Sequence, residues 1–209
     1  MGYSISWFAV PETHADSFFQ KLSLVRTGET EEYPNSMISS ARLDTGWRML
    51  WYDKTVCPFL EDETLSQLSH HHDIIACTVE EHCMDSTATL WQSGLRTWSI
   101  HHNGNDGPKE LGIAGTLPGC FDSIRSELER KQTEDGGMDA EVDHLFDIPL
   151  AVARHIVGFK HDEESPYILD GVFHVLARGS AIANPSLLKR GFIARLFQPL
   201  PKRPPDNKA

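Results

Sequence analysis

The sequence predicts an α+β protein in which about five mainly antiparallel strands form one sheet packed by helices on at least one face. Segments with alternating apolar residues are concentrated in residues 1–105, segments with helical spacing fall in residues 115–200, and no repeat is visible. Strands grouped before helices are typical of an α+β domain with an antiparallel sheet. The length of 209 residues fits a single domain over residues 1–185 with a C-terminal appendage over residues 186–209.

Five segments are predicted to be strands because apolar residues recur at every other position. Trp47, Met49 and Trp51 show this spacing within one of them. The predicted strands are Tyr3–Val10, Gly46–Asp53, Ile74–Glu80, Asp85–Gln92 and Leu95–Asn103. The Ser93-Gly94 pair separates the last two and predicts a two-residue hairpin turn.

Apolar residues three or four positions apart predict helices within residues 1–185. Phe18 and Phe19 belong to the first, with Thr13 as its predicted cap, and Asp147 is the predicted cap of the fourth. The five predicted helices begin near Thr13, Pro58, Pro118, Asp147 and Val172. Residues 26–45 are polar with Gly and Pro and predict a long loop, which is uncommon unless the loop is functional.

The C-terminal appendage has a different composition from the rest of the chain. Its stretch "SLLKRGFIARLF" predicts an amphipathic basic helix, and "PKRPPDNKA" predicts a disordered tail. We expect this helix to dock on the acidic body of the protein. The alternative is a peptide that binds a membrane surface or a partner.

The charge is unevenly distributed along the chain. The net charge is −11, and because residues 189–209 hold six basic residues against Asp206, the rest of the chain carries −16. An acidic body repels nucleic acid and attracts a basic protein partner. Glu29, Glu31 and Glu32 lie in the predicted loop and are the first candidate partner contacts. The alternative is that the acidity only maintains solubility.

Cysteine usage and hydropathy favour a cytoplasmic protein. The four cysteines have no CxxC spacing, and Cys77 and Cys120 stand among apolar or small residues, as a buried reduced thiol does. No apolar run approaches the roughly 20 residues of a membrane span. The N-terminal segment resembles a strand and lacks the basic start of a signal peptide.

Six of the eleven histidines fall between Ser69 and Asp106, which raises the question of a metal site. Counting outward from the predicted turn places His101 and His102 on opposite faces, so they do not share an ion. The same register places Asp85 opposite His102. His82, Asp85 and His102, with Glu80 beside them, would then form a small zinc or iron site. The alternative is a simple Asp85–His102 ion pair at the exposed end of the sheet.

The register also places Trp91 opposite Arg96, and Trp98 on the same face as both. Trp91 and Arg96 are expected to form a cation–π contact. Trp91, Arg96 and Trp98 are therefore candidate contacts for a partner or ligand. The alternative is that the tryptophans belong to a core covered by helices.

These observations leave three functional hypotheses and no cofactor. The preferred hypothesis is an acidic binding protein that neutralises or chaperones a basic protein partner, as a bacterial toxin-immunity protein does. The second is a metal-dependent enzyme of the hydrolase class that uses His82, Asp85 and His102. The third is a ligand-binding or structural module with a Trp-rich sheet face. The motifs H-E-x-x-H and G-x-S-x-G are absent from the sequence, as are phosphate-binding and dinucleotide-binding glycine motifs.

Overall fold

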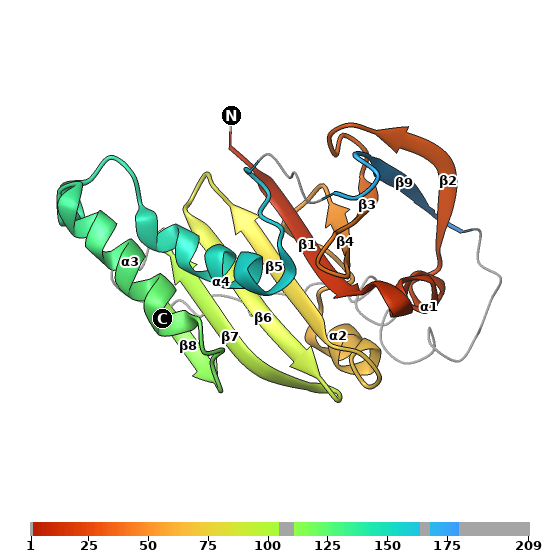
Figure 1. Ribbon diagram of the computed structural model, residues 1–209, viewed down its shortest axis with the longest axis horizontal. Coiled ribbons are helices and arrows are strands. Elements are labelled where there is room, and N and C mark those ends of the chain that lie inside the picture. Colours follow the sequence, from red (N-terminus) through yellow and green to blue (C-terminus); the bar gives the residue numbers. More distant parts are fainter. Residues whose placement is uncertain (1, 105–110, 164–167, 180–209) are drawn as a thin grey trace, which may run out of the picture.

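A single antiparallel sheet organises the protein (Figure 1). The computed structural model describes residues 2–104, 111–163 and 168–179. The strand order is β2-β9-β3-β4-β1-β5-β6-β7-β8. The bounds are β1 Ser4–Pro11, β2 Leu24–Glu31, β3 Ile38–Arg42, β4 Trp47–Tyr52, β5 Ile74–Glu80, β6 Asp85–Gln92, β7 Leu95–Asn103, β8 Leu111–Gly115 and β9 Phe173–Arg178. The predicted α+β class with an antiparallel sheet is confirmed, but the sheet has nine strands and not about five.

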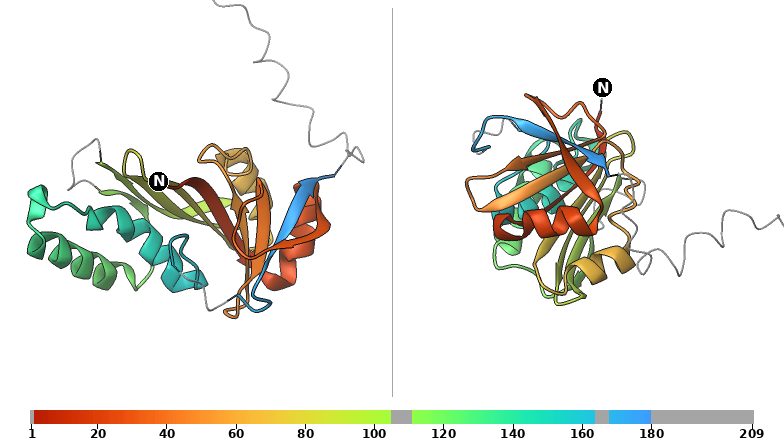
Figure 2. Two further views of the ribbon diagram at one scale, coloured as in Figure 1. Left: turned by 90° about the horizontal axis from the view of Figure 1, so that it is seen from above. Right: turned by 90° about the vertical axis from the view of Figure 1, so that its right-hand side faces the viewer.

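Helices lie on both faces of the sheet (Figure 2). The α-helices of the described residues are α1 Ala15–Lys21, α2 Asp62–Leu68, α3 Phe121–Glu134 and α4 Asp147–Val157, and the short 3-10 helices are η1 Glu12–His14, η3 Gly137–Asp139 and η4 His144–Phe146. Helices α1 and α2 pack on one face, and α3 and α4 pack on the other. The predicted separation of strands from helices along the chain is only approximate, because α1 and α2 lie among the early strands and β8 and β9 follow residue 105.

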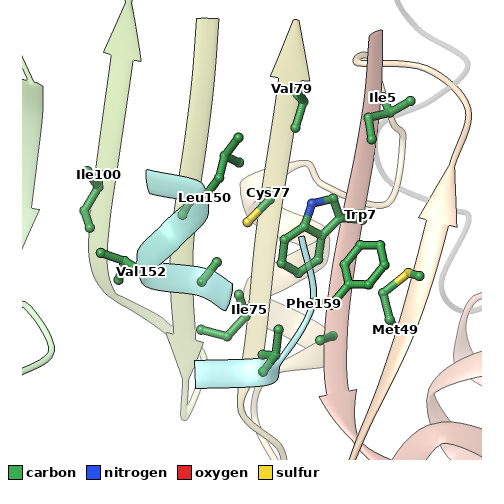
Figure 3. Packing of buried hydrophobic residues seen from close by; sticks show 14 of the residues in the cluster. Ile5, Trp7, Met49, Ile75, Cys77, Val79, Ile100, Leu150, Val152 and Phe159 are labelled. Carbon is green, nitrogen blue, oxygen red and sulfur yellow. The ribbon is translucent and has the colours of Figure 1, made fainter. Parts of the chain in front are cut away.

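The larger core lies between the sheet and helix α4 (Figure 3). Trp7 of β1 is completely buried and meets the ring of Phe159 edge-on, with 5.3 Å between the ring centroids. Leu150 and Val152 of α4 are also completely buried against the sheet. Cys77 lies in the same core, as predicted for a thiol that behaves as a small apolar side chain. Burial raises the pKa of this thiol well above its usual value.

A second core lies on the opposite face, beneath α1 and α2. Phe18 of α1 packs on Phe8 of β1 with 5.1 Å between ring centroids, so the predicted buried face of this helix is confirmed. Leu65 and Leu68 of α2 belong to the same core, as does Trp91 of β6. This core does not extend along the whole length of β5, β6 and β7.

Four strands, β2, β3, β8 and β9, were not predicted from the sequence. The predicted loop over residues 26–45 contains most of β2 and all of β3. In β2 only Leu24 is buried, so this edge strand lacks the alternation that predicts a strand. The predicted helix over Val172–Arg178 is strand β9, whose Phe173 and Leu176 are buried three positions apart, a spacing that resembles a helix. Pairing with β2 and β3 determines the strand conformation there.

The predicted helix caps were also wrong. Neither η1 nor α1 has a side-chain cap, so Thr13 does not act as one. Asp147 is the first residue of α4, and its carboxylate instead pairs with the ammonium of Lys160 at 3.0 Å. The side-chain cap lies earlier, at η4, where the carboxylate of Asp143 accepts hydrogen bonds from the backbone N–H groups of residues 145 and 146. The predicted helix of residues 186–209 lies outside the described residues.

Candidate functional site

The hairpin formed by β6 and β7 determines which side chains reach each face of the sheet. Ser93 and Gly94 both have positive φ, at 51° and 81°, as a two-residue turn of this kind requires, and the predicted turn is confirmed. Next to it, Trp91 pairs with Arg96, also as predicted. Beyond this pair Thr97 is an extra residue, a β-bulge, because the next pair is Leu90 with Trp98.

The bulge shifts the rest of the predicted register by one residue. Asp85 pairs with Asn103 and not with His102, so the predicted Asp85–His102 ion pair is wrong. Trp98 lies in the α4-side core, whereas Trp91 lies in the α2-side core. The two tryptophans therefore do not share a face, because each one-residue shift moves a side chain to the other side of the sheet.

The prediction that His101 and His102 point to opposite faces is confirmed. The side chain of His101 is 43% exposed, and its Nε2 lies 2.9 Å from the carboxylate of Asp85. His102 is completely buried on the other face, and its Nε2 lies 2.8 Å from the carboxylate of Asp143. Asp143 thus joins the sheet to η4 while it caps that short helix.

The α2 side of β5, β6 and β7 forms a partly exposed polar surface, which we call the open face. Its members are Thr78, Glu80, Asp85, Thr87, Thr89, Ser99 and His101. Thr78, Thr87 and His101 are direct neighbours across the three strands, and all three side chains are half-buried. Figure 2 shows that α3 and α4 lie across the other face, whereas α2 lies near the middle of the sheet. Among the described helices, α2 is the one that contacts this side of β6, close to Trp91.

A groove lies at the α2 end of the open face. Its volume is about 240 Å³, and its walls include Asp62 and Leu65 of α2, Thr87 and Trp91 of β6, and Arg96 of β7. The guanidinium of Arg96 lies 5.7 Å from the centre of the Trp91 ring and 3.4 Å from the carboxylate of Asp62. The predicted cation–π contact is therefore present, on a tryptophan that is itself only 5% exposed.

Two carboxylates occupy the other end of the open face. Glu80 of β5 pairs directly with Asp85 of β6. The Glu80 carboxylate accepts a hydrogen bond from the hydroxyl of Ser4 and lies 2.7 Å from Nδ1 of His82. These hydrogen bonds, that from Ser4 first, lower the pKa of Glu80 to about 2, so it stays ionised over the physiological range. The carboxylate of Asp85 is hydrogen-bonded to the imidazole of His101.

Placing two carboxylates directly opposite each other has an energetic cost. Like charges at this position destabilise an antiparallel pair. An added cation would be attracted to this end of the sheet.

A second set of imidazole and carboxylate groups lies on the α4 side and was missed by sequence reasoning. Nε2 of His161 lies 3.1 Å from the Glu81 carboxylate, and the His161 ring meets Tyr3 edge-on at 5.0 Å. Both His161 and Lys160 are nearly buried. These contacts fasten the segment after α4 to the start of β1. The sequence contains no local signal for them, because the partners are about eighty positions apart.

The three residues of the predicted metal site are not brought together. The imidazole of His82 pairs with the carboxylate of Glu80, and that of His101 pairs with Asp85. The imidazole of His102 pairs with Asp143 on the opposite face. In the part of the chain that the structure describes, no group of three or more His, Cys, Asp or Glu side chains is arranged to hold a metal ion.

The predicted acidic contacts lie at the far edge of the sheet from β8. Glu29 and Glu31 are on β2, and Glu32 follows it. Glu29 and Glu32 are exposed, while the Glu31 carboxylate accepts hydrogen bonds from the backbone and hydroxyl of Ser36. These three residues thus form an acidic region that is separate from the open face.

Comparison with known proteins assigns no function to this arrangement. No family model, no curated protein and no solved structure matches the chain. None of the described helices combines the length and the apolar character needed to cross a membrane.

Proposed function

We propose that this protein binds a basic protein partner through the open face. The observation that carries the proposal is the direct pairing of Glu80 with Asp85 on a partly exposed sheet surface. A lysine or arginine of a partner would relieve the repulsion between these carboxylates. An overall charge of −11 would also speed the approach of a basic protein.

The groove at the other end of the face holds a cation of the chain itself, so it adds no attraction for a basic partner. Arg96 already stacks on Trp91 and pairs with Asp62, so the groove combines an aromatic ring and a carboxylate around a guanidinium. The hydroxyls of Thr78, Thr87 and Ser99 lie between the two ends and can donate to or accept from a partner's backbone. Neutralisation of a basic toxin by an immunity protein is one setting for such binding.

Binding of a labelled heptalysine peptide, followed by fluorescence anisotropy, tests the proposal. We expect the double variant Glu80→Gln/Asp85→Asn to raise the Kd about tenfold, equivalent to about 1.4 kcal/mol. The matched control is Glu29→Gln/Glu32→Gln, which removes two charges from the β2 region and should leave the Kd nearly unchanged. Thermal melting of each variant establishes that it is folded.

Salt provides the second arm of this experiment. Raising the ionic strength from about 0.05 M to about 0.5 M should weaken binding to the native chain strongly, because the Debye length falls from about 14 Å to about 4 Å. Equal weakening by both double variants would show that the peptide responds to total charge alone. That result, or binding that salt does not change, would remove the basis for the open face as the site.

A further inference from the structure

The two edges of the sheet differ in whether they can accept another strand. Edge strand β2 is interrupted, because its pairing with β9 shifts between Arg26 and Thr30, and Gly28 there has φ of +90°. It also carries Arg26, Glu29 and Glu31. Bulges and charged side chains are the usual means by which proteins prevent strand addition at an edge.

Edge strand β8 has neither a shift in its pairing nor a charged side chain, and its one residue with positive φ, Gly115, stands at its end. Its sequence is LGIAG, with neither charge nor proline, and its five residues pair with β7 without interruption. Residues 112–115 are exposed, including 39% of Ile113. Among the described residues, no strand pairs with the outer side of β8. A regular, uncharged edge of this kind can form a backbone ladder with an extended segment.

The side chains of β8 indicate what an added strand would carry. Gly112 pairs with His101 and Ala114 pairs with Ser99, so these two small residues continue the open face. A long cationic side chain beside Gly112 would extend over it toward the His101–Asp85 pair. Ile113 pairs with Ile100 and lies on the α4 side, where it offers an apolar contact to the alternate residues of the added strand.

We infer that an extended segment of the basic partner, alternating basic and apolar residues, adds to β8 as a tenth strand. This inference rests on the proposed function and specifies how the partner binds. The charge balance favours a basic segment over a second copy of this chain, because two copies that each carry −11 repel one another.

The test uses the full chain and the nine-residue peptide KVKVKVKVK, compared with the same peptide N-methylated at its interior amides. N-methylation removes the backbone donors but keeps every charge and side chain. Because several ladder hydrogen bonds are lost, we expect the Kd to rise by about tenfold or more. The unmodified peptide should also slow amide hydrogen exchange of residues 112–114.

A matched pair of variants locates the binding edge. Ile113→Glu places a charge on β8, and Val25→Glu places one on the half-exposed β2 residue. The new charge is negative, so weaker binding of a basic peptide to Ile113→Glu cannot come from repulsion. We expect Ile113→Glu to weaken binding about tenfold and Val25→Glu to leave it unchanged.

The outcomes separate this inference from the proposed function. If both peptides bind equally and exchange in β8 is unchanged, but Glu80→Gln/Asp85→Asn still weakens binding, strand addition is wrong and the open face stands. If neither peptide binds at low salt, both ideas are wrong. A dimer of the free chain with protected β8 amides, detected by sedimentation and exchange, would assign the edge to a second copy and overturn the inference.

Discussion

The two faces of β5, β6 and β7 are built from the same strands but have opposite characters. On the α4 side, one row across the strands consists of Cys77, Ala88 and Ile100, each 1% exposed or less. The next row, on the α2 side, consists of Thr78, Thr87 and His101, all half-buried. One face therefore supplies the packing that holds the strands together, and the other is free to carry hydroxyls and charges that contribute little to stability.

The largest effect is expected where the covered face packs on α4. Leu150 is completely buried, so Leu150→Ala should lower the free energy of unfolding by about 2–5 kcal/mol. Thr87→Ala on the open face should lower it by about 1 kcal/mol or less. Urea unfolding of both variants measures the difference. Similar losses for the two would mean that the open face is also part of the core.

The adjacent histidines give a sharper version of the same comparison. His102→Ala would leave the Asp143 carboxylate without its imidazole partner, and we expect a loss of about 1–3 kcal/mol in the free energy of unfolding. His101→Ala removes an exposed pair with Asp85 and should cost about 1 kcal/mol or less. The contrast is measured by equilibrium unfolding at neutral pH. A greater loss for His101→Ala would contradict the assignment of the two faces.

These two histidines also show how far the sequence could predict the site. Their opposite orientation follows from strand alternation alone, and the turn at Ser93-Gly94 has a local signal, so both were predicted correctly. The bulge at Thr97 has no such signal. Strand β8 lies close to the bulge, since Gly115 has φ of +83° and a Cβ there would lie 2.1 Å from the carbonyl oxygen of Thr97. Because the predicted register lacked this extra residue, it paired His102 with Asp85, whereas the imidazole lies against Asp143.

The fold could be predicted wherever its pattern is local. The strands with a buried, alternating face were found, and helices α1, α3 and α4 were placed close to their observed positions. Strand β9 could not be predicted, because its partners β2 and β3 lie more than 130 positions earlier in the chain. The open face was missed as a surface for a related reason. Its exposure depends on where α2 ends relative to β5 and β6, which alternation does not specify.

The effect that depends on pH concerns the carboxyl group of Glu80. Hydrogen bonds from Ser4 and His82 lower the pKa of Glu80 to about 2, below its usual value of about 4.5. Between these values the unfolded chain binds more protons than the folded one at this residue, so stability falls as the pH decreases. The contribution of Glu80 to stability is present above about pH 4.5 and is lost as the pH approaches 2.

The variant Glu80→Gln removes this contribution, whereas Glu29→Gln serves as the control for loss of one exposed carboxylate. In urea unfolding series, the gap between the native chain and Glu80→Gln should narrow from pH 5 to pH 2.5. Parallel curves would mean that these hydrogen bonds do not hold the Glu80 carboxylate in solution.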